Sequence, residues 1–138
     1  MGRILAIDYG GKRTGLAVTD PFKIIATGLT TIPSQELVAW IKKYIQTEQV
    51  ELILMGWPTN WDDSDTHATP LVRAAINRLK KEFPQIPLET ADERYTSKMA
   101  TQSMVESGLK KKDRRNKALV DEIAATILLQ DYLRSKGL

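Results

Sequence analysis

Cysteine is absent from the 138-residue chain, and histidine occurs only once. The lack of thiols excludes a disulfide framework and any thiolate-bound metal site, and it is compatible with a reducing compartment. No apolar run approaches the roughly 20 residues that a membrane-spanning helix needs. The first residues also lack the basic-then-apolar order of a secretion signal, because Asp8 interrupts them. We therefore expect a cytoplasmic protein with no membrane partner.

The chain also lacks a strong excess of charge, internal repeats and low-complexity segments. Its 20 basic residues exceed its 17 acidic residues by a net charge of only +3. This balance permits a polyanionic partner without requiring one. Hydrophobic residues make up 42% of the chain, as in ordinary globular proteins. The length suits one core, so we expect a single domain over residues 1–138.

Apolar periodicity predicts three strands followed by alternating helices and strands. The expected elements are a hairpin over 4–18, an edge strand over 23–32, a helix capped by Ser34, a strand over 50–56, a helix from Thr69-Pro70 to about Phe83, a strand over 86–91, a helix to about Ser107, and a last helix that Asn116 caps and that runs to about Arg134. The inner face of the 69–83 helix is expected to carry Leu71, Ala74, Ala75, Arg78 and Leu79. This order predicts an α/β fold with a five-stranded mixed sheet, whose first three strands form an antiparallel meander, flanked by helices.

One carboxylate lies where the first strand turns into the hairpin loop. Strand alternation places Asp8 on the same face as Ile4 and Ala6, which are expected to face a core. An ionised group beside a core is costly unless it is paired or bound to a metal. Alternatively, Asp8 accepts hydrogen bonds from the turn amides of Gly10 and Gly11, an ordinary role for aspartate. The strand alone does not decide between these roles.

Further acids lie where they could join Asp8. Asp92 and Glu93 end the strand over 86–91, and ligand sites in open α/β sheets gather beyond the carboxyl ends of strands. Asp121 shares a face of the last helix with Ala124 and other small or apolar residues. Small residues let a helix approach a sheet closely, which would carry Asp121 toward Asp8. Alternatively, Asp121 is an acid favoured near a helix N-terminus by the helix dipole.

Four sequence blocks together resemble the YqgF-type family, also called RuvX-type. They read DYGGKRTGLA at 8–17, GWPTN at 56–60, DERYT at 92–96 and DEIAATILLQDYL at 121–133. The match spans the chain. The resemblance implies a ribonuclease H-like fold. Members of the family are described as nucleases that mature the 5′ end of precursor 16S ribosomal RNA, or as Holliday junction resolvases.

The resemblance implies that Asp8, Glu93 and Asp121 form an acidic triad that holds Mg²⁺ or Mn²⁺. Carboxylate oxygens suit these hard cations, and bound divalent ions support in-line attack of an activated water on a phosphodiester. The expected enzyme is thus a Mg²⁺-dependent endonuclease that forms no covalent intermediate. The choice between Asp92 and its neighbour stays open, and we favour Glu93.

Residues of the same blocks, and the basic run over 110–115 that leads into the helix bearing Asp121, are candidates for nucleic-acid contacts. The nucleic-acid-binding residues that we expect are Lys12, Arg13, Asn60, Arg94, Lys110, Lys111, Lys112, Arg114 and Arg115. For Lys12, Arg13 and Arg94 the alternative is a salt bridge to a nearby acid. The run over 110–115 is alternatively a solvated loop. The expected partner is precursor ribosomal RNA or a DNA junction, bound by a monomer or a homodimer.

This sequence departs from the family pattern after the strand over 50–56. Trp57 replaces the usual leucine, and Trp61 with the acids at 62–65 replaces a glycine-containing stretch. Trp57 and Trp61 could stack on unpaired bases or pack into the protein. The acids are more commonly helix caps than a metal site, and we assign His67 no catalytic role.

Two other function classes compete with the nuclease. A glycine-rich hairpin after an aspartate also resembles the phosphate-binding turn of the actin and sugar-kinase superfamily. Those proteins close two domains around a nucleotide, and the turn here lacks P-loop spacing. The other class is a non-catalytic nucleic-acid-binding module, which retention of all three acids disfavours.

Overall fold

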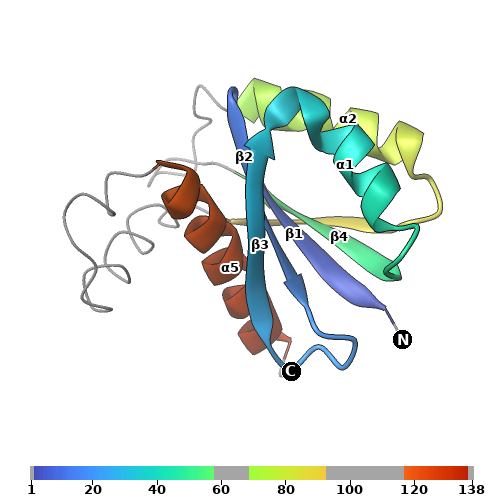
Figure 1. The fold of residues 1–138 in the computed structure, drawn as a ribbon, viewed down its shortest axis with the longest axis vertical. Coiled ribbons are helices and arrows are strands. Elements are labelled where there is room, and N and C mark those ends of the chain that lie inside the picture. Colours follow the sequence, from blue (N-terminus) through green and yellow to red (C-terminus); the bar gives the residue numbers. More distant parts are fainter. Residues whose placement is uncertain (1, 58–68, 93–116, 137–138) are drawn as a thin grey trace.

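A mixed β-sheet between helices forms the framework of the protein (Figure 1). The structure is a computed structural model that describes residues 2–57, 69–92 and 117–136. Its elements are β1 (Arg3–Tyr9), β2 (Arg13–Thr19), β3 (Ala26–Pro33), the short 3₁₀ helix η1 (Ser34–Glu36), α1 (Leu37–Tyr44), β4 (Val50–Trp57), α2 (Thr69–Glu82), β5 (Leu88–Asp92) and α5 (Lys117–Ser135). None of the helices in these ranges is long and apolar enough to cross a membrane.

The strand order is β3-β2-β1-β4-β5. The pairs β1–β2 and β2–β3 are antiparallel, whereas β4 lies parallel to both β1 and β5. The predicted five-stranded mixed sheet with an antiparallel meander is therefore confirmed, and β3 lies at an edge as expected. The parallel strands β1, β4 and β5 all end at one side of the sheet, which we call the carboxyl edge.

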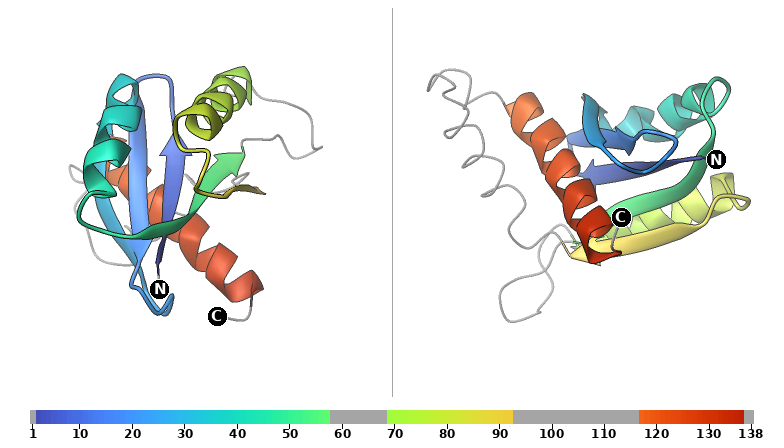
Figure 2. Two further views of the ribbon diagram at one scale, coloured as in Figure 1. Left: turned by 90° about the vertical axis from the view of Figure 1, so that its right-hand side faces the viewer. Right: turned by 90° about the horizontal axis from the view of Figure 1, so that it is seen from below.

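Helices cover both faces of the sheet (Figure 2). Leu5 and Ile7 of β1 belong to a core cluster shared with α1 and α2. Ile4 and Ala6 of the same strand belong to a second cluster shared with α5. This alternation confirms the predicted two faces of β1, and it places Asp8, two residues after Ala6, on the α5 side.

Two sequence expectations about helices on the other face are wrong. Ser34 does not cap α1, because three residues of 3₁₀ helix precede that helix and no side chain caps either element. The inner face of α2 is also displaced from the predicted one. Its buried residues are Thr69, Val72, Ala75, Ile76 and Leu79, whereas Leu71, Ala74 and Arg78 are exposed.

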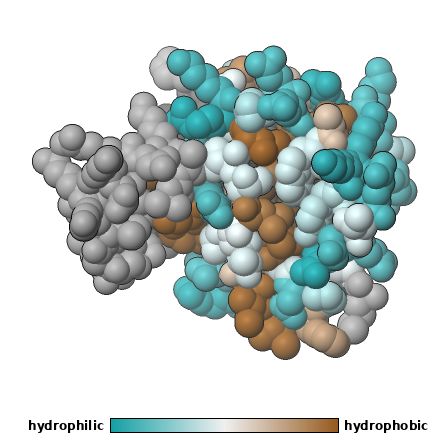
Figure 3. Space-filling view, viewed as in Figure 1, coloured by the Kyte–Doolittle hydropathy of each residue, from teal (hydrophilic) through white to brown (hydrophobic). Residues whose placement is uncertain are grey.

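The loop that joins β2 to β3 lies at the side of the sheet opposite the carboxyl edge. The Asp20 carboxylate accepts hydrogen bonds from the backbone N–H groups of Phe22, Ile24 and Ile25 at 3.1, 2.7 and 2.8 Å. These bonds, that from Ile25 foremost, hold the pKa of Asp20 below its usual range. The three bonded residues expose apolar side chains, and Figure 3 shows apolar surface at this end of β3. Asp20 thus fixes the shape of an apolar loop.

Candidate active site

Asp8 lies at the carboxyl edge and is paired directly with a glycine. In the antiparallel β1–β2 ladder, Asp8 is the register partner of Gly15. Directly paired residues project toward the same face of a sheet. Gly15 and Asp8 therefore share the side that α5 covers.

The backbone of α5 rests on Gly15. A Cβ atom at Gly15 would lie only 2.0 Å from the carbonyl oxygen of Asp121. No residue larger than glycine fits this contact without a shift of the helix. Since Gly15 lies opposite Asp8, the contact brings Asp121 of the helix and Asp8 of the strand to the same part of the sheet.

A second glycine, Gly28 in β3, also lets α5 lie close to the sheet. A Cβ at Gly28 would lie 2.9 Å from side-chain atoms of Glu122 and Thr126. On the helix side, Ala124, Ala125 and Leu128 are buried. The prediction that small helix residues permit close packing is confirmed, and the sheet contributes its own small residues. Sequence reasoning did not assign this role to Gly15 or Gly28, although an isolated glycine within a strand is a signal of close approach.

The far end of α5 is also tied to the sheet. The Tyr132 hydroxyl donates a hydrogen bond to the Glu89 carboxylate of β5. Burial, together with this bond, raises the pKa of Tyr132 to about 12. Contacts at both ends therefore fix the position of the helix that carries Asp121.

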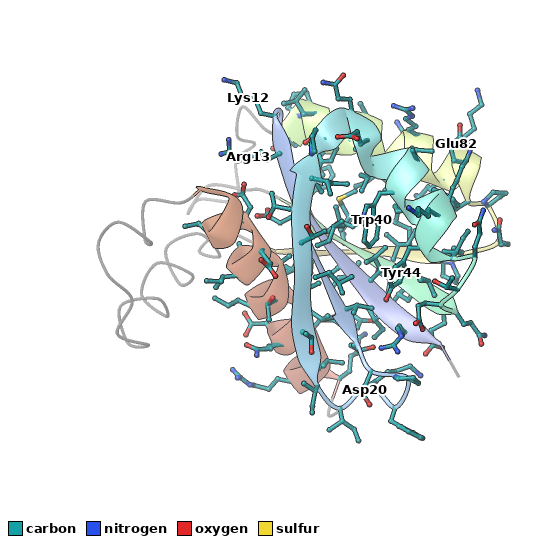
Figure 4. The ribbon with its side chains drawn as sticks, in the orientation of Figure 1. Lys12, Arg13, Asp20, Trp40, Tyr44 and Glu82 are labelled. Atoms are coloured by element: carbon teal, nitrogen blue, oxygen red, sulfur yellow. The ribbon has the colours of Figure 1, made fainter. Side chains whose placement is uncertain are left out.

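Arg13 forms an ion pair with Asp121. The Arg13 Nε atom donates to Asp121 Oδ2 at 3.1 Å, and 39% and 24% of the two side chains are exposed. The salt-bridge alternative is thus observed for Arg13. Lys12 precedes Arg13 in the turn between β1 and β2 and is exposed. Figure 4 shows both side chains at one end of β2, whereas Asp20 lies at its other end. The turn therefore places one cation, Arg13, against Asp121 and carries a second, Lys12, next to it in the sequence.

Arg13→Gln should show separately what Arg13 contributes to stability and what it contributes to nucleic-acid binding. We expect the free energy of unfolding to fall by less than about 1 kcal/mol, because the ion pair is partly exposed and solvent screens it. The salt dependence of nucleic-acid binding should weaken by about one unit of slope if Arg13 contacts a phosphate. Thermal unfolding and binding titrations at several salt concentrations measure both. An unchanged salt slope would contradict a phosphate contact.

Ser34 fixes the shape of the basic turn. Its hydroxyl is bonded to the hydroxyl of Thr14 at 2.8 Å and donates to the carbonyl of Gly10 at 2.5 Å. Its backbone N–H donates to the carbonyl of Lys12 at 3.0 Å. Ser34 and Thr14 are both buried, so these bonds are shielded from water. Their partners lie about 20 residues away in sequence, which explains why the sequence pattern did not reveal this role.

Trp57 ends β4 between the two other parallel strands. Its register partner on β5 is Asp92. The Trp57 ring packs against the core cluster shared with α1 and α2, and the Cζ atom of Arg73 lies 5.6 Å from the ring centre. The packing alternative for Trp57 is therefore observed, together with a cationic neighbour from α2.

Several predicted site residues lie outside the described residues. They are Asn60, Trp61, the acids at 62–65, His67, Glu93, Arg94, Lys110, Lys111, Lys112, Arg114 and Arg115, and the helix expected to end near Ser107. Within residues 2–57, 69–92 and 117–136, no three Asp, Glu or His side chains gather closely enough to hold a metal ion. Asp8 and Asp121 are thus the two predicted triad members whose placement is described.

The donor set at this place fits a hard divalent cation. Its two described acids come from β1 and α5, and both offer carboxylate oxygens, which Mg²⁺ and Mn²⁺ prefer. The Arg13 guanidinium already balances one of these charges. The arrangement suits a site that handles phosphate oxygens and cations together.

Two solved structures of RuvC have a similar fold. The Thermus thermophilus RuvC structure in complex with a Holliday junction substrate matches with a TM-score of 0.61 over 99% of this chain and 96% of that chain, at 16% identity. Another T. thermophilus RuvC structure matches with a TM-score of 0.57 over 98% of this chain and 96% of that chain, also at 16% identity. These similarities confirm the ribonuclease H-like fold.

Sequence relatives match the chain end to end. A protein of Phocaeicola vulgatus is 54% identical over 99% of this chain and 98% of its own length, and one of Flavobacterium psychrophilum is 53% identical over 99% of each. Both are named "Putative pre-16S rRNA nuclease". The family model RuvX, described as Holliday junction resolvase, matches residues 2–135. The chain therefore belongs to the RuvX family of nucleases.

Proposed function

We propose that this protein is a divalent-metal-dependent endonuclease that processes the 5′ end of precursor 16S ribosomal RNA in the cytoplasm. The observation that supports the proposal is the close approach of the Asp121 backbone to Gly15, which is the register partner of Asp8. The names of the relatives, at more than half identity, support the choice of RNA substrate.

Asp8 and Asp121, together with Glu93, would hold Mg²⁺ or Mn²⁺. Bound divalent cations supply activation of the attacking water and stabilisation of charge at the phosphate. The protein's own contribution is to fix the acids on rigid elements, since Asp8 lies on a central strand and Asp121 on a helix packed against it. Side chains held in this way lose little freedom when they bind a ligand.

Basic residues would hold the nucleic-acid backbone beside these acids. Arg13 would donate to a phosphate oxygen next to the cleaved bond, from the position in which it now pairs with Asp121. Lys12 would contact a neighbouring phosphate. Asn60, Arg94 and the basic run over 110–115 complete the proposed interface. In the proposed mechanism no side chain forms a covalent intermediate with the substrate.

The proposal treats residues 1–138 as one domain that acts as a monomer. Both described acids come from the same chain, so cleavage of one strand needs no second copy. The second candidate function is resolution of four-way DNA junctions, which the description of the matching family favours. That activity requires two coordinated cuts and would call for a homodimer.

A direct comparison of substrates tests the proposal. The purified full chain is offered a labelled precursor 16S leader and a four-way DNA junction, each with Mg²⁺ and with EDTA. We expect Mg²⁺-dependent cleavage of the RNA leader and little cleavage of the junction. Preferred cleavage of the junction would support the second candidate. Cleavage of neither substrate would contradict both and favour a non-catalytic binding module.

A further inference from the structure

Trp57 and Arg73 form an aromatic and cationic surface, which we call the Trp57–Arg73 platform. The Arg73 Cζ atom lies 5.6 Å from the centre of the indole ring. Trp57 is half-buried at the end of β4, whereas Arg73 is exposed on α2. Because the indole face attracts a cation through its quadrupole, the guanidinium is held over the ring. The two flat groups are therefore kept together before any ligand arrives.

The platform lies next to the proposed active site along the carboxyl edge. Trp57 lies two residues after Met55, which is the register partner of Ile7, so it ends β4 beside the end of β1. Its partner on the other side is Asp92. Trp57 packs with the α1 and α2 face, whereas Asp8 lies on the α5 face. A strand of nucleic acid that contacted both residues would therefore have to cross the carboxyl edge.

The basic turn lies beside the helix that carries Arg73. A Cβ atom at Gly11 would lie 3.6 Å from Leu71 Cδ1, so the turn lies close to the beginning of α2. Lys12 of that turn is exposed. Phosphates held by this lysine would leave their bases within reach of the neighbouring helix. The surroundings of the platform thus favour a nucleotide over an uncharged ligand.

We infer that the platform binds an unpaired nucleotide of the substrate by stacking on its base. Aromatic rings, indole among them, and guanidinium planes are protein groups on which exposed bases stack. Inside a duplex both faces of a base are covered by its neighbours, so only an unpaired or terminal nucleotide can use the platform. The inference rests on the proposed nuclease function and narrows its substrate to a strand that is unpaired beside the cleaved bond.

Binding of short oligonucleotides tests this inference without cleavage. A labelled single-stranded RNA 12-mer and a hairpin duplex of equal length are titrated with the full chain in EDTA, and anisotropy reports affinity. We expect Trp57→Leu, which keeps apolar packing but lacks a stacking face, to weaken single-strand binding about tenfold. Binding of the duplex should change less than about twofold.

A second variant keeps the charge and leaves the core untouched. Arg73→Lys should weaken single-strand binding about threefold, because lysine has no plane for stacking, and it should leave the salt dependence unchanged. Lys80→Gln removes a charge from an exposed position near the other end of α2 and should not alter the ratio of the two affinities. Circular dichroism verifies that each variant is folded.

Two results would overturn the inference. One is an equal loss of single-strand and duplex affinity in Trp57→Leu, and the other is no loss in either Trp57→Leu or Arg73→Lys. Because cleavage is not measured, a negative result leaves the nuclease proposal standing. A failure to find Mg²⁺-dependent cleavage would likewise leave the stacking measurement valid.

Discussion

Asp8→Asn is expected to lower Mg²⁺-dependent cleavage by about a thousandfold. Asparagine has nearly the shape of aspartate but no negative charge, so it is a poor ligand for a hard cation. The loss corresponds to several kcal/mol of transition-state stabilisation, the size expected when metal chemistry is removed. Single-turnover cleavage of the labelled RNA leader measures it. Nucleic-acid affinity should stay within about threefold of the original protein, because the basic turn is unchanged.

A matched control separates this effect from a general loss of negative charge. Asp131 lies on the same helix as Asp121, but it is exposed and pairs only loosely with Arg134 at 3.8 Å. Asp131→Asn should retain full cleavage. Cleavage by Asp8→Asn at the rate of the unmodified protein, with Mg²⁺ present, would exclude Asp8 from the active site.

Gly15→Ala is expected to lower the stability of the fold more than any other substitution that adds a single methyl group. The added Cβ would lie 2.0 Å from the carbonyl oxygen of Asp121, so the helix must shift away from the sheet. Overpacking of this kind costs about 3 kcal/mol, which would lower the melting temperature by about 10 °C. Cleavage should fall as well, because the shift carries Asp121 away from Asp8. Thermal unfolding and the cleavage assay measure the two effects.

Gly11→Ala provides the control for glycine replacement as such. Its Cβ would lie 3.6 Å from Leu71 Cδ1, an ordinary van der Waals distance. We expect the free energy of unfolding to change by less than about 0.5 kcal/mol. If both variants were equally stable, close packing of α5 on Gly15 could not be what positions Asp121.

Much of the framework could be predicted from the sequence because its signals are local. Alternation in β1 separates Ile4 and Ala6 from Leu5 and Ile7, and the two sets enter different core clusters as expected. The Thr69-Pro70 start of α2 is marked by residues that begin helices. Two features of the candidate site could be predicted in the same way. One is the strand that ends in Asp8, and the other is the acid on the small-residue face of the last helix.

Other features depend on contacts between distant residues and could not be predicted. The hydroxyl of Ser34 would suit a helix cap, yet it bonds to Thr14 and Gly10 across the sheet. The inner face of α2 was ambiguous, because Leu71 and Val72 are both apolar and only packing against the sheet selects Val72. The choice of Arg13 as the partner of Asp121 follows from the tertiary fold, since the sequence offers several cations and several acids.

The docking of α5 has a consequence for the order of events during synthesis. Asp8 emerges from the ribosome early, whereas Asp121 belongs to the last described helix. Under the proposed function, a growing chain that has not reached α5 lacks one of the acids and cannot cut. Because a domain folds as a unit, a nuclease for ribosomal RNA would thus stay inactive beside the ribosome that synthesises it until α5 has been translated.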